Sequence, residues 1–324
     1  MKRSRVLLLA LSLIASLVAA WPSAAAEQAQ QPVAAARNLD KFDRALLRHA
    51  PVLKFHKEDP DVPLDADEQF FPVRVQAITN NVGNQLQRAS GAPLATRASG
   101  GRGLTIGYLR GINNVTYPNS YVILESDQLN ERGNNPDEEI EDDARRFQAD
   151  PRYRDRIYGR VVRAPNDGGA WLQYWFFYYY NDYPDIPLYN EAFDHEGDFE
   201  MIQIKVNADV EPILAVYAQH KRLAWCRWSD MTPWGWKPVV YVAQGSHASY
   251  FHPGLDFRDA FNNGQSERRF KLIRIGNNSP RWLNWPGQWG GSGSSPKGPK
   301  QQGVRWTNPD QLFEDAVHEE QCRP

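Results

Sequence analysis

The chain has 324 residues, a formal net charge of −2 at neutral pH and 12% aromatic residues. A mildly acidic chain without a concentrated basic stripe lacks the electrostatic footprint of a nucleic-acid binder. Its aromatic content also exceeds that of intrinsically disordered chains. We therefore expect a folded protein that binds no nucleic acid, long enough for one large all-β domain or two smaller domains.

The first 26 residues have the pattern of a cleavable secretory signal. Basic residues at positions 2, 3 and 5 precede an apolar run, and Ala24, Ala25 and Ala26 form a small-residue cleavage site before Glu27. The apolar run covers about 15 residues, fewer than the ~20 that a spanning helix needs, so an uncleaved anchor is the less favoured alternative. We expect residues 1–26 to be removed, residues 27–37 to form a flexible tether, and the protein to be secreted or periplasmic and not transmembrane.

The predicted elements follow the tether in this order along the chain. Apolar spacing predicts a helix over residues 38–50, with Asn38 as the N-cap and Pro51 as its end, and the alternation over 51–56 predicts a strand. The polar, glycine-rich stretch 80–103 predicts a long loop. The charged stretch 137–156 predicts an exposed helix broken at Pro151.

The central third consists of short segments rich in β-branched and aromatic residues. Turn residues separate these segments, and no amphipathic helix lies between consecutive ones; they are 160–163, 171–182, 199–206, 213–220, 238–246 and 270–275. This pattern predicts a mainly β fold, an antiparallel β-sandwich with a few peripheral helices and long loops. The segment 171–182 is apolar on both faces, which is typical of a central strand covered on both sides.

The C-terminal part is dense in tryptophan, proline and glycine over residues 282–303. Such glycine- and serine-rich chain is flexible by default, but Trp282, Trp285 and Trp289 indicate a segment laid on the sheet surface. A closing helix is predicted over 308–320, with Pro309 at its first position. Residues 38–324 are thus expected to form a single β-sandwich domain.

Cys226 and Cys322 are the two cysteines of the chain. In an oxidising compartment they can pair, and the alternative is two unrelated thiols. A bridge between them would close a long loop, for which chain entropy gives a stabilisation of roughly 4 to 5 kcal/mol.

The densest group of ionisable residues is the stretch 194–200, with the sequence DHEGDFE. Period-two geometry places Asp198 and Glu200 on the core-facing side of a strand through 198–206, whereas the opposite side turns polar and is expected to face solvent. Two inward carboxylates repel each other and are costly to desolvate unless a cation lies between them. Hard oxygen ligands favour Ca²⁺, Mg²⁺ or Mn²⁺ over Zn²⁺. Pairing with Arg or Lys across the sheet is the alternative.

Histidines complete the predicted site. Gly197 allows His195 or Glu196 to fold back toward the carboxylates, and His220 and His247 end two further strands, at the rim where loops build sites. The predicted metal ligands are Asp198, Glu200, His195 and His220. His220, His247 and Glu196 are the candidate catalytic bases, although His220 alone is equally well explained as a hydrogen-bonded structural residue. The sequence contains no G-x-S-x-G elbow, so it lacks this signature of a serine hydrolase.

Several motifs occur in an order that resembles a known family. They are APVLKFH, WLQYWFFYYYND, HEGDFE, VYAQH, VYVAQGSHASYF and WPGQWGG. In this order, from about residue 50 to residue 310, the chain is similar to the vacuolar protein sorting-associated protein 62 family. Phe199 stands where that family usually has Trp, a conservative departure that leaves the carboxylates in place.

The HEGDFE block is also similar to the G-H-R-H-D-W-E heptapeptide of the necrosis-inducing Nep-like secreted cytolysins. Those proteins are β-sandwiches that hold a divalent cation with the Asp and Glu of the motif. His195, Asp198 and Glu200 match its first His, its Asp and its Glu. Gly197 and Glu196 replace its second His and its Arg, so the roles of those two side chains do not carry over.

Three hypotheses follow for the function. The first is an exported recognition module whose cation organises loops that bind an extracellular or envelope ligand, namely a lipid head group, a glycan or a protein. The second is a metal-dependent hydrolase that uses a metal-activated water. The third is a structural envelope protein.

Overall fold

The computed structural model describes residues 39–58, 67–81, 84–88, 93–95, 120–123, 136–182, 194–254, 262–290, 295–319 and 321–324. The predicted signal (1–26), the predicted tether (27–37) and Asn38 lie outside the described residues. Contacts along the chain divide it into two units, residues 1–39 and residues 40–324. The helices and strands named below lie in the second unit.

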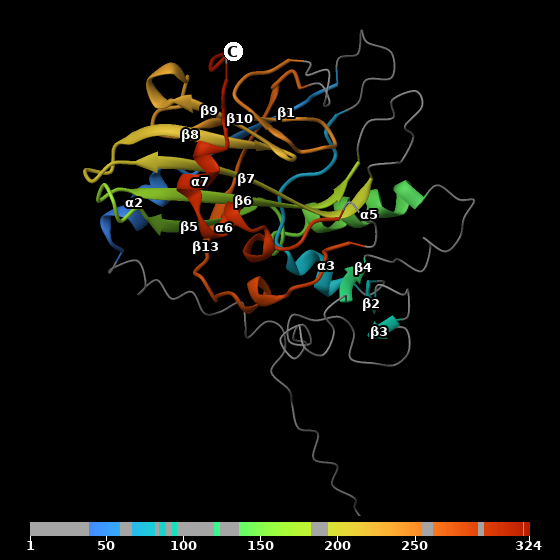
Figure 1. Cartoon of the computed structure of the whole chain (residues 1–324). Coiled ribbons are helices and arrows are strands. Elements are labelled where there is room, and N and C mark those ends of the chain that lie inside the picture. The colour runs from blue at the N-terminus through green and yellow to red at the C-terminus, as the bar shows by residue number, and fades with distance from the viewer. Residues whose placement is uncertain are drawn as a thin grey trace, which may run out of the picture. The chain divides into compact units, whose positions relative to one another are not determined.

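A seven-stranded sheet contains most of the predicted strands. Its order is β13 (Lys271–Arg274), β5 (Arg156–Arg163), β6 (Ala170–Asn181), β7 (His195–Val206), β8 (Pro212–Gln219), β9 (Arg222–Arg227) and β14 (Val317–His318). The strands from β5 to β9 are antiparallel neighbours, and they lie side by side in Figure 1. All twelve residues of β6 are buried, which confirms the prediction of a central strand covered on both sides.

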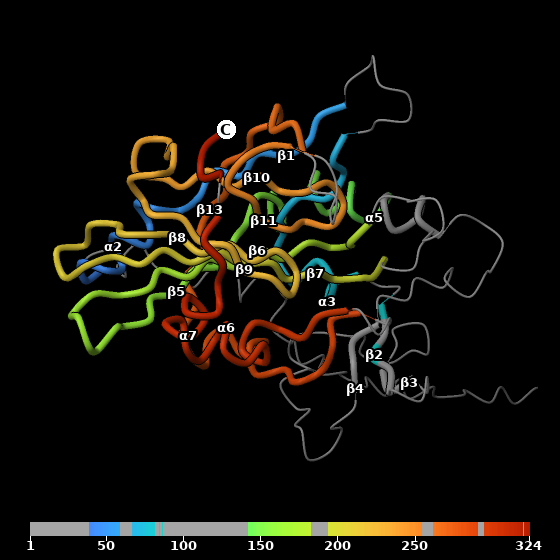
Figure 2. The backbone as a smooth tube through the Cα atoms, turned by 45° about the horizontal axis from the view of Figure 1, so that its top comes forward, coloured from blue at the N-terminus to red at the C-terminus, as the bar shows by residue number. Residues whose placement is uncertain are grey.

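A four-stranded sheet forms the second layer, in the order β11 (Ser249–Tyr250), β10 (Val239–Val242), β1 (Val52–Phe55) and β12 (Ser266–Arg269). Its apolar residues share one core with alternate residues of β6 and β7, so the β-sandwich is confirmed. Both sheets are mixed rather than purely antiparallel, because β1 runs parallel to β10, β13 to β5 and β14 to β9. Figure 2 shows β1 beside β10 although they come from distant parts of the chain.

The predicted strand 270–275 is divided between the two sheets. β12 pairs with β1 in the smaller sheet, and β13 pairs with β5 in the larger one, with Phe270 between them. The predicted long loop over 80–103 is also wrong in part. It contains β2 (Gln85–Arg88) and β3 (Pro93–Ala95), which form a small sheet with β4 (Ser120–Ile123). These strands are too short and polar for their alternation to stand out, and pairing with distant chain defines them.

The helices agree with the prediction except at their ends. α2 (Lys41–Arg48) begins two residues later than expected, because the Asp40 carboxylate accepts hydrogen bonds from the Phe42 and Asp43 amides at 2.8 Å and caps the helix. α5 (Pro136–Ala149) buries Ala144 and Phe147, so the charged segment is exposed on one side only. No helix among the described residues combines the length and the apolar character needed to cross a membrane.

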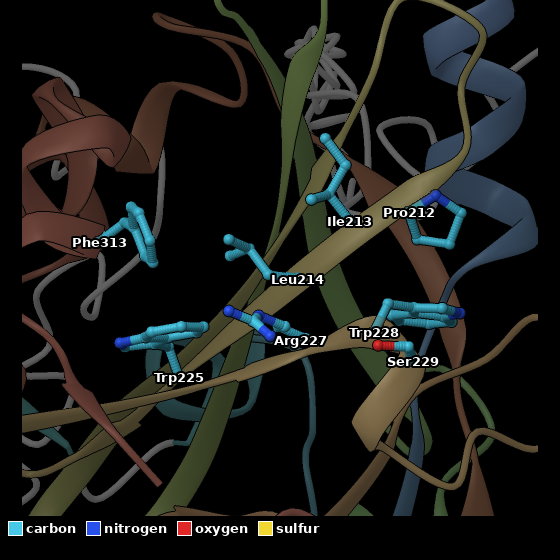
Figure 3. Close-up of a pocket in the computed structure, with 8 residues that line it drawn as sticks. All are labelled: Pro212, Ile213, Leu214, Trp225, Arg227, Trp228, Ser229 and Phe313. Carbon is cyan, nitrogen blue, oxygen red and sulfur yellow. The ribbon is translucent and has the colours of Figure 1, made fainter.

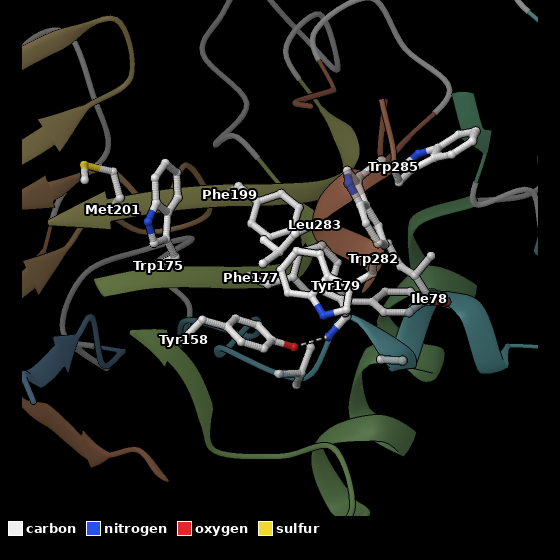
Figure 4. Packing of buried hydrophobic residues seen from close by; sticks show 14 of the residues in the cluster. Ile78, Tyr158, Trp175, Phe177, Tyr179, Phe199, Met201, Trp282, Leu283 and Trp285 are labelled. Carbon is white, nitrogen blue, oxygen red and sulfur yellow. Dashed lines mark hydrogen bonds between the residues drawn. The ribbon is translucent and has the colours of Figure 1, made fainter. Parts of the chain in front are cut away.

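The second face of the large sheet is covered by helices and by the tryptophan-rich segment. α3 (Gln76–Asn80), α5, and the short helices η3 (Arg281–Asn284), η4 (Pro299–Gln301), α6 (Val304–Thr307) and α7 (Pro309–Glu314) supply this cover. The Phe199 ring stacks on the Trp282 ring with centroids 6.0 Å apart (Figure 4). The Trp289 ring meets the Phe199 ring edge-on at a centroid distance of 5.6 Å. The segment is therefore laid on the sheet, as predicted.

This cover overturns the expectation that the second face of β7 is solvent-facing. Phe199, Met201 and Gln203 are all buried there. The Gln203 side-chain amide donates to the Pro309 carbonyl at 2.9 Å, and the Lys205 ammonium lies 2.8 Å from an Asp167 oxygen. The polar residues of this face thus find partners in segments far along the chain.

The predicted closing helix is shorter than expected. α7 ends at Glu314, and Val317 and His318 then pair with β9 as β14. Just beyond β14, Cys322 is bonded to Cys226 of β9, so the two cysteines form a disulfide. The C-terminus is thereby attached to an edge of the large sheet.

Replacing both cysteines, Cys226→Ala with Cys322→Ala, is expected to lower the free energy of unfolding by up to about 4 kcal/mol, because the bridge restricts a long loop in the unfolded chain. Denaturant unfolding measures the loss. Reductant should destabilise the wild type similarly and leave the double variant unchanged. Equal stability of wild type and variant would contradict the prediction.

Two glycines let the tryptophan-rich segment approach β7 closely. Gly197 has φ +60°, and a Cβ there would lie 2.1 Å from the Trp289 carbonyl oxygen. A Cβ on Gly290 would lie 2.2 Å from the Glu196 carbonyl oxygen. Glycine is required at both positions because backbone from the other segment fills the space.

Gly197→Ala is expected to cost at least about 2 kcal/mol of stability, because a left-handed conformation alone costs roughly 1–2 kcal/mol and the clash adds to it. Gly235→Ala is the matched control: its φ is +61°, and nothing lies within 4 Å of the added Cβ. Thermal unfolding of both variants separates the two contributions. Equal losses would show that the close approach is unimportant.

Candidate functional site

Three carboxylates and one histidine gather at one end of the core between the two sheets. We call Glu68, Asp198, Glu200 and His247 the acidic cluster. The Nδ1 atom of His247 lies 3.1 Å from Asp198 Oδ2, and its Nε2 atom lies 3.8 Å from Glu68 Oε1. All four residues are buried, and His247 is 0% exposed.

Strand pairing positions the β7 carboxylates. Asp198 is opposite Tyr178 and Glu200 is opposite Phe176 in the antiparallel register of β6 and β7. Tyr178 and Phe176 belong to the core between the sheets, as do Ile202 and Ile204 of β7, so the predicted inward face of the strand is correct. The His247 ring stacks on the Tyr178 ring at a centroid distance of 3.7 Å.

A tight turn between β10 and β11 positions His247. Its backbone has φ +60°, its amide donates to the Ala243 carbonyl at 3.0 Å, and Ala243 donates in turn to Ala248 at 2.9 Å. Glu68 holds the turn from the other side, because its two carboxylate oxygens accept from the Gly245 and Phe70 amides, each at 2.7 Å. Glu68 therefore fixes the loop that carries His247.

The charges of the cluster are unequal. Burial alone would lower the pKa of His247, but its hydrogen bond to Asp198 and the negative charges of Glu68 and Asp198 outweigh burial and raise the pKa to about 9. Burial, followed by the charges of Asp198, Glu68 and Glu200, raises the pKa of Tyr178 well above its ordinary value. With its carboxyl groups ionised, the cluster sets three negative charges against one imidazolium.

His195 begins β7 and lies near the acidic cluster. Burial lowers the pKa of its imidazole, whereas the charge of Asp198 opposes that change and His247 adds to it. His220 is solvent-exposed in the turn between β8 and β9, with φ +54°, and its carbonyl accepts a hydrogen bond from the Arg305 guanidinium. A role for either histidine as a metal ligand stays a prediction.

The candidate bases differ in their access to solvent. His220 is exposed, whereas Glu196 is buried in β7 opposite Tyr180 and His247 is completely enclosed. A general base must reach the proton that it abstracts, directly or through one water. The enclosed His247 is arranged instead as a partner of Asp198 and Glu68.

Sequence reasoning missed Glu68 and Tyr178. Glu68 follows an acidic, proline-containing stretch without periodicity, so nothing local marks it as a buried residue. Tyr178 is one of many aromatic residues in β6. Only the register of β6 against β7 and the path of the β10–β11 turn bring these residues together.

Carboxylate oxygens are the ligands that a hard divalent cation prefers, but in the acidic cluster the His247 ring lies between Asp198 and Glu68. The arrangement is that of a histidine bridging two carboxylates. In the part of the chain that the structure describes, no three His, Cys, Asp or Glu side chains are grouped so that they could hold a metal ion.

A surface groove of about 500 Å³ lies across the outer strands β8 and β9, and Figure 3 shows the side chains around it. Phe313 of α7 closes one side, where the Trp225 ring meets it edge-on at 5.3 Å. The lining is largely apolar and consists of Pro212, Ile213, Leu214, Trp225, Arg227, Trp228, Ser229 and Phe313. None of these residues belongs to the acidic cluster.

His247→Gln is expected to lower the free energy of unfolding by about 3 kcal/mol, because it leaves buried carboxylates without their positive partner. Chemical denaturation with a chelator present measures this loss without any contribution from bound cations. The control is His252→Gln, which changes a half-buried histidine outside the cluster. Equal losses in the two variants would contradict the assigned role of His247.

No family model matches the chain, and no curated protein matches it in sequence. The resemblance to the vacuolar protein sorting-associated protein 62 family therefore stays a prediction. Among solved structures, Necrosis and Ethylene inducing Protein 2 from the causal agent of cocoa's Witches Broom disease is 12% identical, with a TM-score of 0.33 over 50% of this chain and 68% of its own.

A structure titled "Toxin fold for microbial attack and plant defense" is also 12% identical, with a TM-score of 0.33 over 52% of this chain and 70% of its own. "NLPPya in complex with glucosamine" is 11% identical, with a TM-score of 0.32 over 51% and 70%. The first of the three is a necrosis-inducing protein, the group that the HEGDFE block resembles. At these scores the likeness carries no argument about what this chain does.

Proposed function

We propose that this chain is an exported, divalent-metal-binding β-sandwich protein that acts as a ligand- or surface-recognition module of the vacuolar protein sorting-associated 62 type. One observation carries the proposal: three buried carboxylates, from Glu68, Asp198 and Glu200, lie at the end of the core, and His247 is the positive partner of two of them, Asp198 and Glu68. A buried cluster with more carboxylates than positive groups would bind a small dication.

Desolvation is the physical reason. Moving a carboxylate out of water costs several kcal/mol unless a positive charge or hydrogen bonds compensate for it. His247 supplies one positive charge near Asp198 and Glu68. A bound cation would neutralise the surplus, with Asp198, Glu200 and Glu68 as its ligands and His195 as the nearby imidazole. Oxygen donors favour Ca²⁺, Mg²⁺ or Mn²⁺ over Zn²⁺.

Export is supported by two independent features. Residues 1–26 have the basic, apolar and small-residue regions of a secretory signal. Cys226 and Cys322 are joined in a disulfide, which persists in oxidising compartments and is rare in the cytosol.

A recognition role is favoured over hydrolysis by the state of His247. Its ring is enclosed by Tyr178, and both of its nitrogens face carboxylates. A histidine engaged in this way holds a loop in place rather than taking a proton from water. The cation would then strengthen one end of the sandwich, where Glu68 holds the turn that carries His247.

The test is direct titration of the purified protein with Ca²⁺, Mg²⁺ and Mn²⁺ by calorimetry, together with thermal unfolding. We expect binding of one of these ions and a melting temperature that rises with its concentration, because a ligand of the folded state stabilises it by mass action. Asp198→Asn, Glu200→Gln and Glu68→Gln should each weaken binding roughly tenfold or more, since affinity follows the charge of the ligand set.

Asp209→Asn is the control, because it removes an exposed carboxylate outside the cluster and should leave binding unchanged. Undiminished binding in all three cluster variants would refute the proposed site. Absence of any bound dication in the wild type would refute the proposed function.

A further inference from the structure

Two tryptophans are solvent-exposed in the connection between β9 and β10. We call Trp234, Gly235 and Trp236 the tryptophan turn. The exposed fractions of the two side chains are 47% and 57%. Most tryptophans in the described residues are nearly inaccessible, namely Trp171, Trp175, Trp282, Trp285, Trp289 and Trp306. Large apolar side chains placed in water in this way mark interaction surfaces.

The tryptophan turn is held firmly by groups other than its rings. The amides of Trp234 and Lys237 donate to each other's carbonyls at 2.9 and 3.1 Å, and Gly235 has φ +61°. The Nδ1 atom of buried His49 lies 2.5 Å from the Trp236 carbonyl oxygen, and the Lys237 ammonium donates to the Ala50 carbonyl at 3.1 Å. The backbone is thus fixed to the chain between α2 and β1, while the rings point outward.

Basic side chains surround the two rings. The Arg48 guanidinium lies 5.7 Å from the Trp236 ring centroid, and that of Arg269 lies 4.5 Å from the Trp234 ring centroid. Leu47, beside Arg48 at the end of α2, is also exposed. Arg269 also lies beside Glu267, whose Oε1 is 3.4 Å from its Nε atom. Arg48 and Arg269 thus place two guanidinium groups beside the rings, against the one carboxylate of Glu267.

We propose that the tryptophan turn docks the protein onto the surface of an anionic lipid bilayer, with Trp234 and Trp236 in the interface and Arg48 and Arg269 against the head groups. Tryptophan is favoured at membrane–water interfaces, where one side of the ring is apolar and the other is wet. Basic side chains beside it are attracted by anionic lipids. The turn is solvent-exposed and its backbone is fixed by hydrogen bonds, which suits shallow insertion.

The arrangement suits a lipid surface better than a sugar. A glycan stacks on open aromatic faces and is oriented by convergent polar groups in a concave site. Here guanidinium groups lie over the two rings, and the turn does not line the groove across β8 and β9. This inference rests on the proposed function in one respect, because it names the partner that the recognition module would bind. None of its residues belongs to the acidic cluster.

Vesicle co-sedimentation tests the proposal. The purified protein, with its disulfide intact, is mixed with vesicles of phosphatidylcholine alone or of phosphatidylcholine with phosphatidylglycerol. We expect binding to the anionic vesicles that weakens as salt is added. Trp234→Ala with Trp236→Ala should reduce the affinity roughly tenfold or more. Arg48→Gln with Arg269→Gln should reduce it roughly thirtyfold, because each basic residue near the surface contributes about fivefold.

Val304→Ser is the matched control, since it removes an exposed apolar side chain outside the patch. Circular dichroism and the melting temperature establish that each variant is folded, and calorimetric dication binding is measured on the same samples. Loss of vesicle binding with dication binding intact supports the docking surface independently of the cation site. Unchanged vesicle binding in the double tryptophan variant, or wild-type binding to an oligosaccharide but to no vesicle, would overturn the proposal.

Discussion

The pairing of β6 with β7 is the interaction on which the rest of the fold depends. β6 is buried along its whole length, and alternate residues of the two strands enter two separate cores. The four-stranded sheet and α2 cover one face, whereas helices and the tryptophan-rich segment cover the other. Because neither face is left to water, every polar group on these strands needs a partner inside the protein. That requirement is most severe for four residues of β7, namely Asp198, Glu200, Gln203 and Lys205.

The acidic cluster shows how the requirement is met at one end of the strand pair. A loop from the four-stranded sheet brings His247 between Asp198 and Glu68, and the Glu68 carboxylate holds the same loop through the Gly245 amide. The cluster therefore joins the two sheets by charge where their apolar core ends. The same groups that hold the layers together also leave the negative surplus from which we infer cation binding.

Much of this could be predicted from local sequence, and the failures have a common cause. The alternation through Asp198, Glu200, Ile202 and Ile204 correctly identifies the inward face of β7, because period two is a property of the strand itself. The opposite face contains Gln203 and Lys205 and resembles a solvent-facing surface; it is buried because Pro309 and Asp167, from distant segments, supply their partners. Glu68 was missed for the same reason, since only the tertiary path of the chain places it beside His247.

The position of β1 has a consequence for the order of folding. This strand is near the start of the described chain, yet it lies in the interior of its sheet, where Val52 pairs with Val239 on one side and with Arg269 on the other. Its partners, β10 and β12, are thus synthesised only after more than half of the chain has followed β1. Contacts of such long range form late and slowly. The sandwich therefore cannot close while its C-terminal half is still on the ribosome, and the N-terminal strand waits for partners that are synthesised much later.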